Sequence, residues 1–131
     1  MNPYASPQAY RNSAVLTATP EQLVVMLYDG AVRFLRQAEV AMSEGAWLHS
    51  FEKLSRGEAI LDELLATLNM DTGEIAERLQ AIYIFCKKTL IEARIQRQGE
   101  KIAQVVALLA NLREAWARLA EQAKAATPAS V

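Results

Sequence analysis

The sequence has little of the residue types from which most active sites and metal centres are built. Its 131 residues include one cysteine and one histidine. A single cysteine, Cys86, excludes an internal disulfide framework and is typical of a reducing compartment. With His49 as the only histidine, the chain lacks both a zinc ligand set and the Glu-x-x-His pairs of a di-iron bundle. The sequence therefore predicts no metal and no organic cofactor.

Other absences narrow the class of function. The chain has no glycine-rich phosphate loop, no Gly-x-Ser-x-Gly motif and no carboxylate pair in a context suited to acid–base work, so we expect no enzyme and no catalytic residue. The net charge of −1 gives no overall attraction to nucleic acid. No apolar run reaches transmembrane length, and residues 1–13 lack the apolar core of a signal peptide. We expect a cytoplasmic protein without nucleic acid or membrane insertion.

The sequence is rich in amphipathic helical pattern. Apolar residues recur at three- and four-residue spacing over four stretches, at about residues 20–43, 46–69, 73–98 and 100–125. The stretches are similar in length, and the connections between them are short, so sequential helices must run antiparallel. The sequence predicts an all-α, antiparallel, up-down-up-down four-helix bundle with an extended N-terminal segment.

Local signals mark where these helices begin and end. Thr19 is predicted to be the N-cap of the first helix, with Gln22 completing a capping box. Asp71 with Glu74 predicts a second capping box, at the start of the third helix. Gly99 is predicted to end the third helix.

The sequence predicts that the chain has three parts. Pro3 and Pro7 with their polar neighbours predict a flexible N-terminal segment. Tyr10 and Val15 are apolar enough for this segment to dock back onto the bundle as a cap. The predicted parts are the N-terminal segment 1–18, the bundle 19–125 and a disordered tail 126–131.

The first helix carries two apolar stripes, although a small bundle requires only one. The first stripe is Leu23, Leu27, Ala31, Phe34 and Ala38, and the second is Val24, Tyr28, Val32 and Leu35. The second stripe is explained by core at a helix-rich corner, by cover for a chain terminus, or by a groove for a partner helix. The third helix has a stripe from Ile75 to Ala93 that is also broad. Tyr28 and Tyr83 have an apolar body and a polar tip, which suits either the edge of the core or a half-exposed groove wall.

Three stretches of the chain carry a family resemblance. They are AYRNSAVLTATPEQLVVMLYDGAVRFL at 9–35, GEIAERLQAIYIFCKKTLIEA at 73–93 and LREAWARLA at 112–120. Through them, and most specifically through the TxTPEQL–MLYDG signature, the sequence resembles the flagellin export chaperone family (FliS). The resemblance implies a cytoplasmic four-helix bundle whose hydrophobic grooves hold the C-terminal segment of flagellin as helices. It also implies that this binding prevents premature polymerisation and assists secretion.

The resemblance also implies where a partner binds. In the family an N-terminal segment can cap a groove and move aside for flagellin, and its tyrosine and asparagine match Tyr10 and Asn12. Tyr28, Tyr83 and Trp116 match signature positions of the helices. Arg94 stands where the family commonly has asparagine. The residues we expect to bind the partner are Tyr10, Asn12, Val15, Tyr28, Val32, Leu35, Leu79, Ile82 and Tyr83.

A different class of function stays open from the residues alone. A helical adaptor or dimerisation module with another protein client would show the same apolar surplus. An all-α ligand-binding bundle is disfavoured by the shortage of histidine. The flagellar export apparatus is a further candidate partner, and the sequence leaves open whether the free protein forms a homodimer.

Overall fold

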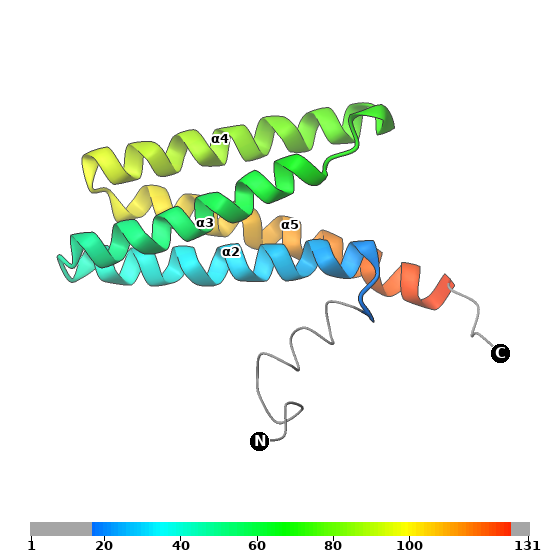
Figure 1. Cartoon of the computed structure of the whole chain (residues 1–131), viewed down its shortest axis with the longest axis horizontal. Helices are drawn as coiled ribbons and strands as arrows, with labels where there is room; N and C mark the ends of the chain where they lie inside the picture. Colours follow the sequence, from blue (N-terminus) through cyan, green and yellow to red (C-terminus); the bar gives the residue numbers. More distant parts are fainter. Residues whose placement is uncertain (1–16, 127–131) are drawn as a thin grey trace, which may run out of the picture.

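The computed structural model describes residues 17–126, which form four long α-helices joined by short turns (Figure 1). The elements are α2 (Pro20–Ser43), α3 (Trp47–Thr67), the 3-10 turn η2 (Met70–Thr72), α4 (Glu74–Gln96) and α5 (Gly99–Ala126). No strand occurs within residues 17–126. The predicted all-α four-helix bundle is confirmed.

Some predictions concern residues that the structure does not describe. Tyr10, Asn12 and Val15 lie outside residues 17–126, as does nearly all of the predicted tail. The division into N-terminal segment, bundle and tail therefore stays a prediction.

The helices are neighbours in space in the order in which they follow along the chain. α2 packs extensively against α3 and α5, and α4 packs against α3 and α5. Because each connection is short, neighbouring helices are antiparallel. α2 and α4 therefore lie diagonally opposite each other across the bundle, and contacts between them have to pass through its core.

The start of α2 agrees with its sequence signals. The Thr19 hydroxyl accepts a hydrogen bond from the Gln22 backbone N–H at 3.2 Å, and the Gln22 side-chain oxygen accepts one from the Thr19 N–H at 2.8 Å. Pro20 occupies the first helical position, where its missing N–H leaves no hydrogen bond unmade. The predicted capping box is confirmed, and it fixes the direction in which α2 enters the bundle.

Two predictions at the other helix ends are wrong. No Asp71–Glu74 capping box forms, because Asn69 caps η2 by accepting the Asp71 N–H at 3.1 Å, and Gly73, at φ 86°, leads directly into α4. Gly99 does not end the third helix but begins α5.

The residue that ends α4 is Arg97, in the left-handed conformation at φ 53°. A non-glycine residue is unfavourable there. The Arg97 guanidinium lies over the ring of Trp47, 4.5 Å from its centroid, and this cation–π contact offsets part of the cost.

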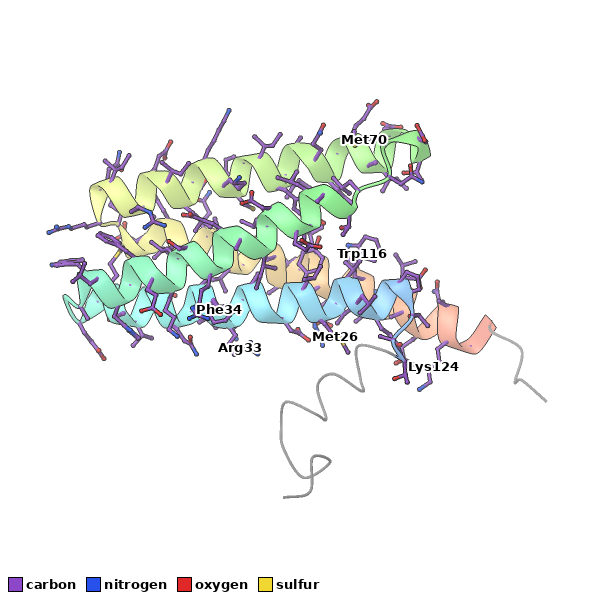
Figure 2. The ribbon with its side chains drawn as sticks, viewed as in Figure 1. Met26, Arg33, Phe34, Met70, Trp116 and Lys124 are labelled. Carbon is purple, nitrogen blue, oxygen red and sulfur yellow. The ribbon has the colours of Figure 1, made fainter. Side chains whose placement is uncertain are left out.

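The core contains residues from both predicted stripes of α2. Tyr28 and Leu35 from the second stripe and Ala31 and Ala38 from the first are all fully buried. Phe34, expected on the core side, lies only half-buried at the outer edge of the α2–α3 contact (Figure 2). The side-chain cations that lie over its ring, 5.2 to 5.7 Å from the centroid, are Arg33, Lys53 and Arg56. The second stripe is therefore largely core.

Two glycines allow α2 and α3 to approach closely. A Cβ at Gly57 would lie 2.6 Å from a methyl carbon of Leu35, and one at Gly30 would lie 3.1 Å from a methyl carbon of Ile60. Leu35 has no exposed surface into which it can move. The absence of a side chain at Gly57 is therefore a packing requirement of the α2–α3 contact.

Gly57→Ala should consequently lower the free energy of unfolding by about 1–3 kcal/mol, because overpacking outweighs the roughly 1 kcal/mol by which alanine favours a helix. Urea titration followed by helical circular dichroism measures this change. Gly99→Ala is the control, because the nearest atom to its Cβ is 4.0 Å away. It should leave stability unchanged or slightly higher. An unchanged midpoint for Gly57→Ala would contradict the packing argument.

Candidate partner-binding groove

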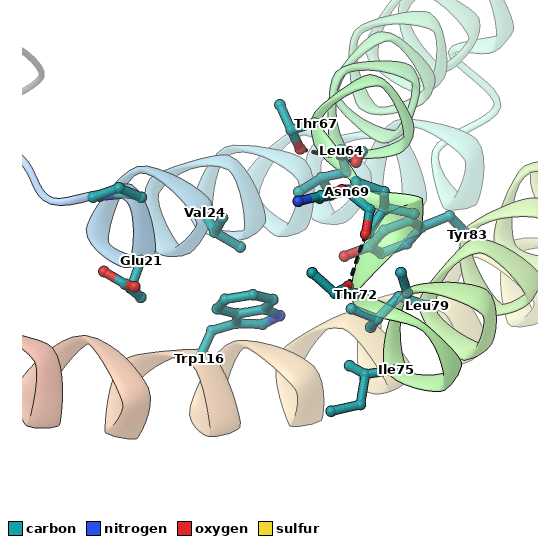
Figure 3. Close-up of a pocket in the computed structure, with 13 residues that line it drawn as sticks. Glu21, Val24, Leu64, Thr67, Asn69, Thr72, Ile75, Leu79, Tyr83 and Trp116 are labelled. Atoms are coloured by element: carbon teal, nitrogen blue, oxygen red, sulfur yellow. Dashed lines mark hydrogen bonds between the residues drawn. The ribbon is translucent and has the colours of Figure 1, made fainter.

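A groove opens at the end of the bundle where η2 joins α3 to α4 (Figure 3). In Figure 1, α3 and α4 diverge from α2 toward this end. We call the cavity, of about 290 Å³, the end groove. Its lining residues are Pro20, Glu21 and Val24 from α2; Leu64, Thr67, Leu68, Asn69 and Thr72 from the end of α3 and the turn; Ile75, Ala76, Leu79 and Tyr83 from α4; and Trp116 from α5.

The walls of the end groove are mostly apolar. Val24 and Leu79 are half-buried, and Ile75 on the rim is 71% exposed. Glu21 is the one charged side chain in the lining. Trp116 projects from α5 toward the end of α3 (Figure 2). An open apolar groove of this kind fits the apolar face of an amphipathic helix.

The floor of the end groove is polar and joins the two diagonal helices. The hydroxyl oxygens of Tyr28 and Tyr83 lie 2.5 Å apart in a hydrogen bond, and their ring centroids are 6.3 Å apart. The side chain of Trp116 also lies close to the Tyr28 hydroxyl. Tyr28 has no exposed surface and Tyr83 only 1%. This pair therefore forms one of the few direct links between α2 and α4.

Burial is the largest cause of the pKa shifts of Tyr28 and Tyr83. Loss of solvent raises the pKa of Tyr28 above its ordinary range, and the hydrogen bond to Tyr83 raises it further. Loss of solvent likewise raises the pKa of Tyr83. Both phenols stay neutral at physiological pH, so the floor offers a partner neutral hydrogen-bonding groups rather than charge.

Comparison with known proteins identifies the family. The family model described as "Flagellar protein FliS" matches residues 2–123. The chain belongs to the FliS family. This FliS-family chain is 35% identical over 113 residues to the flagellar secretion chaperone FliS of Salmonella typhimurium, a match covering 85% of this chain and 84% of the relative. With the Bacillus subtilis chaperone of the same name it is 33% identical over 115 residues, or 88% of this chain and 84% of the relative. With that of Vibrio cholerae it is 28% identical over 129 residues, or 95% of each.

The structure brings some of the expected partner-binding residues to the end groove and places others elsewhere. Leu79 and Tyr83 line it, and Tyr28 lies beneath Tyr83. Leu35 is fully buried against Gly57, away from the end groove. Val32 and Ile82 are half-buried against the core and do not line it. The half-exposed wall considered for both tyrosines is not what the structure shows. Partner binding by these residues stays a prediction.

Eleven of the thirteen residues that line the end groove were not among the expected partner-binding residues. They include Val24, Leu68, Ile75 and Trp116. Val24 belonged to the second stripe of the first helix, so its place on a partner-facing surface was one of the alternatives left open. Ile75 was expected on the core stripe of the third helix, but the α4 register leaves it exposed on the rim. Trp116 belongs to the regular core pattern of α5 but lies half-buried near its solvent-exposed end. A tryptophan at such a boundary can bury its ring and direct its indole N–H to a polar partner.

A second apolar surface of this FliS-family chain lies along the outside of α4. Ile84, Ile91 and Ile95 recur at spacings of seven and four, which places them on one face, with Phe85 beside it. They are 40 to 74% exposed. We call these four residues the α4 outer stripe. It explains the breadth of the apolar pattern predicted for the third helix, because α4 is apolar on both faces.

Arg94, which stands where the resemblance leads one to expect asparagine, is used within the bundle. Its guanidinium donates to Glu58 at 3.0 Å and to the Ser55 hydroxyl at 3.2 Å, and it lies 5.5 Å from the centroid of the Phe51 ring. These contacts join α3 to α4. Arg94 therefore links α3 to α4 in the half of the bundle opposite the end groove.

The residues that first suggested chemistry show no arrangement for it. Cys86 is fully buried, and burial raises its pKa to about 11, so its thiol is unreactive at neutral pH. His49 is exposed near the start of α3. Across residues 17–126, no cluster of three His, Cys, Asp or Glu side chains is placed to hold a metal ion. Within the same residues no helix is long and apolar enough to cross a membrane.

The buried phenols predict a loss of stability at alkaline pH. Because the pKa values of Tyr28 and Tyr83 are raised on folding, the unfolded chain loses protons that the folded chain keeps. Their contribution to stability is fully present below the ordinary tyrosine pKa of 10.0 and declines as the pH rises above it. For each tyrosine the slope approaches about 1.4 kcal/mol per pH unit. Urea titrations between pH 8 and pH 11 measure it.

The Tyr28→Phe and Tyr83→Phe variants test the assignment. Each variant should lack the contribution of one ionising tyrosine to the slope of the free energy of unfolding against pH. The contributions of all residues that wild type and the variant share cancel when their slopes are compared. A slope identical to that of wild type in both variants would show that the loss of stability arises elsewhere.

Proposed function

We propose that this protein is a flagellar secretion chaperone that binds the C-terminal segment of flagellin in hydrophobic grooves. Bound there in the cytoplasm, the segment is kept from premature polymerisation and held ready for secretion. The role requires no catalysis. The observation that carries the proposal is the end groove, an open and largely uncharged cavity, in a chain that belongs to the FliS family.

The physical chemistry of the end groove matches such a client. A polymerising helical segment satisfies its own backbone hydrogen bonds and exposes one apolar face, so it needs apolar cover and few polar contacts. Val24, Leu79 and Trp116 supply apolar cover. Burial of apolar surface contributes roughly 25 cal/mol per Å², part of which offsets the ordering of the client.

The α4 outer stripe supports a longer contact than the end groove alone provides. Ile84, Phe85, Ile91 and Ile95 extend exposed apolar surface along the second half of α4. A client that wraps around the bundle in more than one helix would cover both surfaces. Encounters with the flagellar export apparatus and self-association of the free protein are further proposals for exposed surface of this kind.

A pair of matched variants tests the client. Ile75→Asp places a charge on the rim of the end groove, whereas Leu48→Asp places one on a residue 86% exposed at the opposite end of the bundle. Both residues are surface-exposed, so each variant should change folding stability by no more than about 0.5 kcal/mol. In calorimetric titrations with the flagellin C-terminal segment, Ile75→Asp should bind at least tenfold more weakly than wild type, and Leu48→Asp should bind equally well.

The outcomes separate the function from the site. If wild type does not bind the segment at micromolar concentrations, flagellin is not the client. Sedimentation of the free protein would then test the alternative that it is a dimerisation module. Equal binding by both variants would retain the client and reject the end groove as its site.

We also propose that the N-terminal segment, residues 1–18, covers apolar surface beside α2 through Tyr10, Asn12 and Val15 when no client is bound. Its described end, Thr17 and Ala18, already lines a hollow of about 550 Å³ between α2 and α5, together with Met26, which is 39% exposed. The free energy gained should be small, a few kcal/mol at most, because ordering costs about 1–2 kcal/mol per residue.

Hydrogen exchange of the free protein measures this docking. Amides of residues 14–16 should exchange more slowly than those of residues 127–131, and addition of the flagellin segment should remove the difference. Equal exchange in the two regions before any client is added would refute the capping role.

A further inference from the structure

The hydrogen bonds beneath the end groove determine which hydroxyl is available to a partner. Tyr28 is fully buried, so its hydroxyl proton needs an acceptor within the protein. Within residues 17–126, the one hydroxyl or carbonyl oxygen recorded as a partner of Tyr28 is the Tyr83 oxygen. An indole N–H is a donor only, so the nearby Trp116 supplies no acceptor. Tyr28 therefore donates to Tyr83.

The hydroxyl proton of Tyr83 then points away from Tyr28. In either direction one of the two protons has no acceptor among residues 17–126, and this is less costly for Tyr83, which lines the end groove, than for Tyr28, which has no exposed surface. Tyr28 is therefore the donor and Tyr83 the acceptor, and the remaining proton, on Tyr83, lies at the end groove.

No described residue accepts that last proton. Tyr83 has no second hydrogen bond among residues 17–126, and it lines the end groove (Figure 3). The neighbouring polar groups of the lining are engaged locally: Thr72 donates to the Asn69 carbonyl at 2.7 Å, and Thr67 donates to the Leu64 carbonyl at 2.9 Å. Since Tyr83 is only 1% exposed, water reaches it poorly. A partner that brings an acceptor to this point gains a hydrogen bond that the free protein makes badly.

We propose that Tyr83 is the specificity contact of the end groove and donates to the side-chain carbonyl oxygen of an asparagine or glutamine on the client helix. This proposal rests on the proposed function and identifies the chemical group of the client that the end groove recognises. The backbone carbonyls of a helical client are already bonded within the helix, so the acceptor comes from a side chain. A carboxylate is disfavoured, because the one charged lining residue is the acidic Glu21 and the floor is desolvated.

An amide also matches the second polar group of the lining. The hydroxyl of Thr72 uses its proton on Asn69 and keeps lone pairs free to accept from an amide N–H. A primary amide is both acceptor and donor, so its chemistry suits a lining that offers one hydroxyl proton and one hydroxyl acceptor. An apolar client side chain at this position would leave the proton of Tyr83 unpaired.

Two nearly isosteric variants of α4 test the proposal. Tyr83→Phe removes the hydroxyl that faces the end groove, whereas Thr89→Val removes a buried hydroxyl that donates to the Phe85 carbonyl and does not line the groove. In titrations with the flagellin C-terminal segment, Tyr83→Phe should bind about tenfold more weakly than wild type, which corresponds to about 1.4 kcal/mol, and Thr89→Val should bind within about twofold. Equal losses in both variants, or none in Tyr83→Phe, would overturn the proposal. Wild type that does not bind the segment would instead reject the proposed function.

The client side of the contact is located by a double-mutant cycle. Each asparagine and glutamine of the segment is replaced by leucine and titrated into wild type and Tyr83→Phe. One replacement should weaken binding to wild type and have little further effect on Tyr83→Phe. Additive losses at every position would contradict an amide contact with Tyr83.

A small-molecule probe gives a readout that does not depend on flagellin. Butyramide at millimolar concentration should shift the ring resonances of Tyr83 in wild-type protein, whereas butyrate, which has the same alkyl chain and a negative charge, should not. Shifts with both compounds, or with neither, would show that the groove does not select a neutral amide.

Discussion

The hydrogen bond between Tyr28 and Tyr83 is the constraint on which the arrangement of the bundle depends. It joins the two helices that are diagonally opposite, through a core that is otherwise aliphatic. Two bulky rings fit there because small side chains, such as Ala31 on α2 and Cys86 on α4, lie fully buried near them. Since an unpaired hydroxyl in this position is costly, the pair ties the register of α2 to that of α4.

The end groove follows from the same pair. Tyr83 fills the diagonal of the bundle, but one and two turns closer to η2 the inward side chains of α4 are Leu79 and Ala76, which are smaller. They leave space that Val24 and Trp116 line without filling. The groove is therefore the unfilled continuation of the core, and this explains why its floor is polar and buried while its rim is apolar and exposed.

Sequence predicted what is decided locally and missed what is decided across the bundle. The start of α2 at Thr19 was predictable because a capping box is made within four residues. Arg97 at the end of α4 was not, because its left-handed conformation is supported by Trp47, fifty residues away. Whether Tyr28 forms a groove wall or core depends on the side chain that faces it from α4. Helical periodicity identifies which residues are apolar on one helix, but it does not identify the helix that covers them, so Ile75 and Trp116 could not be assigned from their own stripes.

The position of the end groove also shows how a bundle of this size tolerates an apolar opening. The tight α2–α3 contact at Gly57 and Leu35, and the fully buried Leu54, Leu90 and Ile102, lie toward the middle and the opposite end. The ion pair of Arg94 with Glu58 reinforces that half. Because core truncations cost about 2–5 kcal/mol each, these contacts stabilise the fold without help from the end groove. The end groove contributes less to stability, so its surface is free to be matched to a client rather than to the remainder of the core.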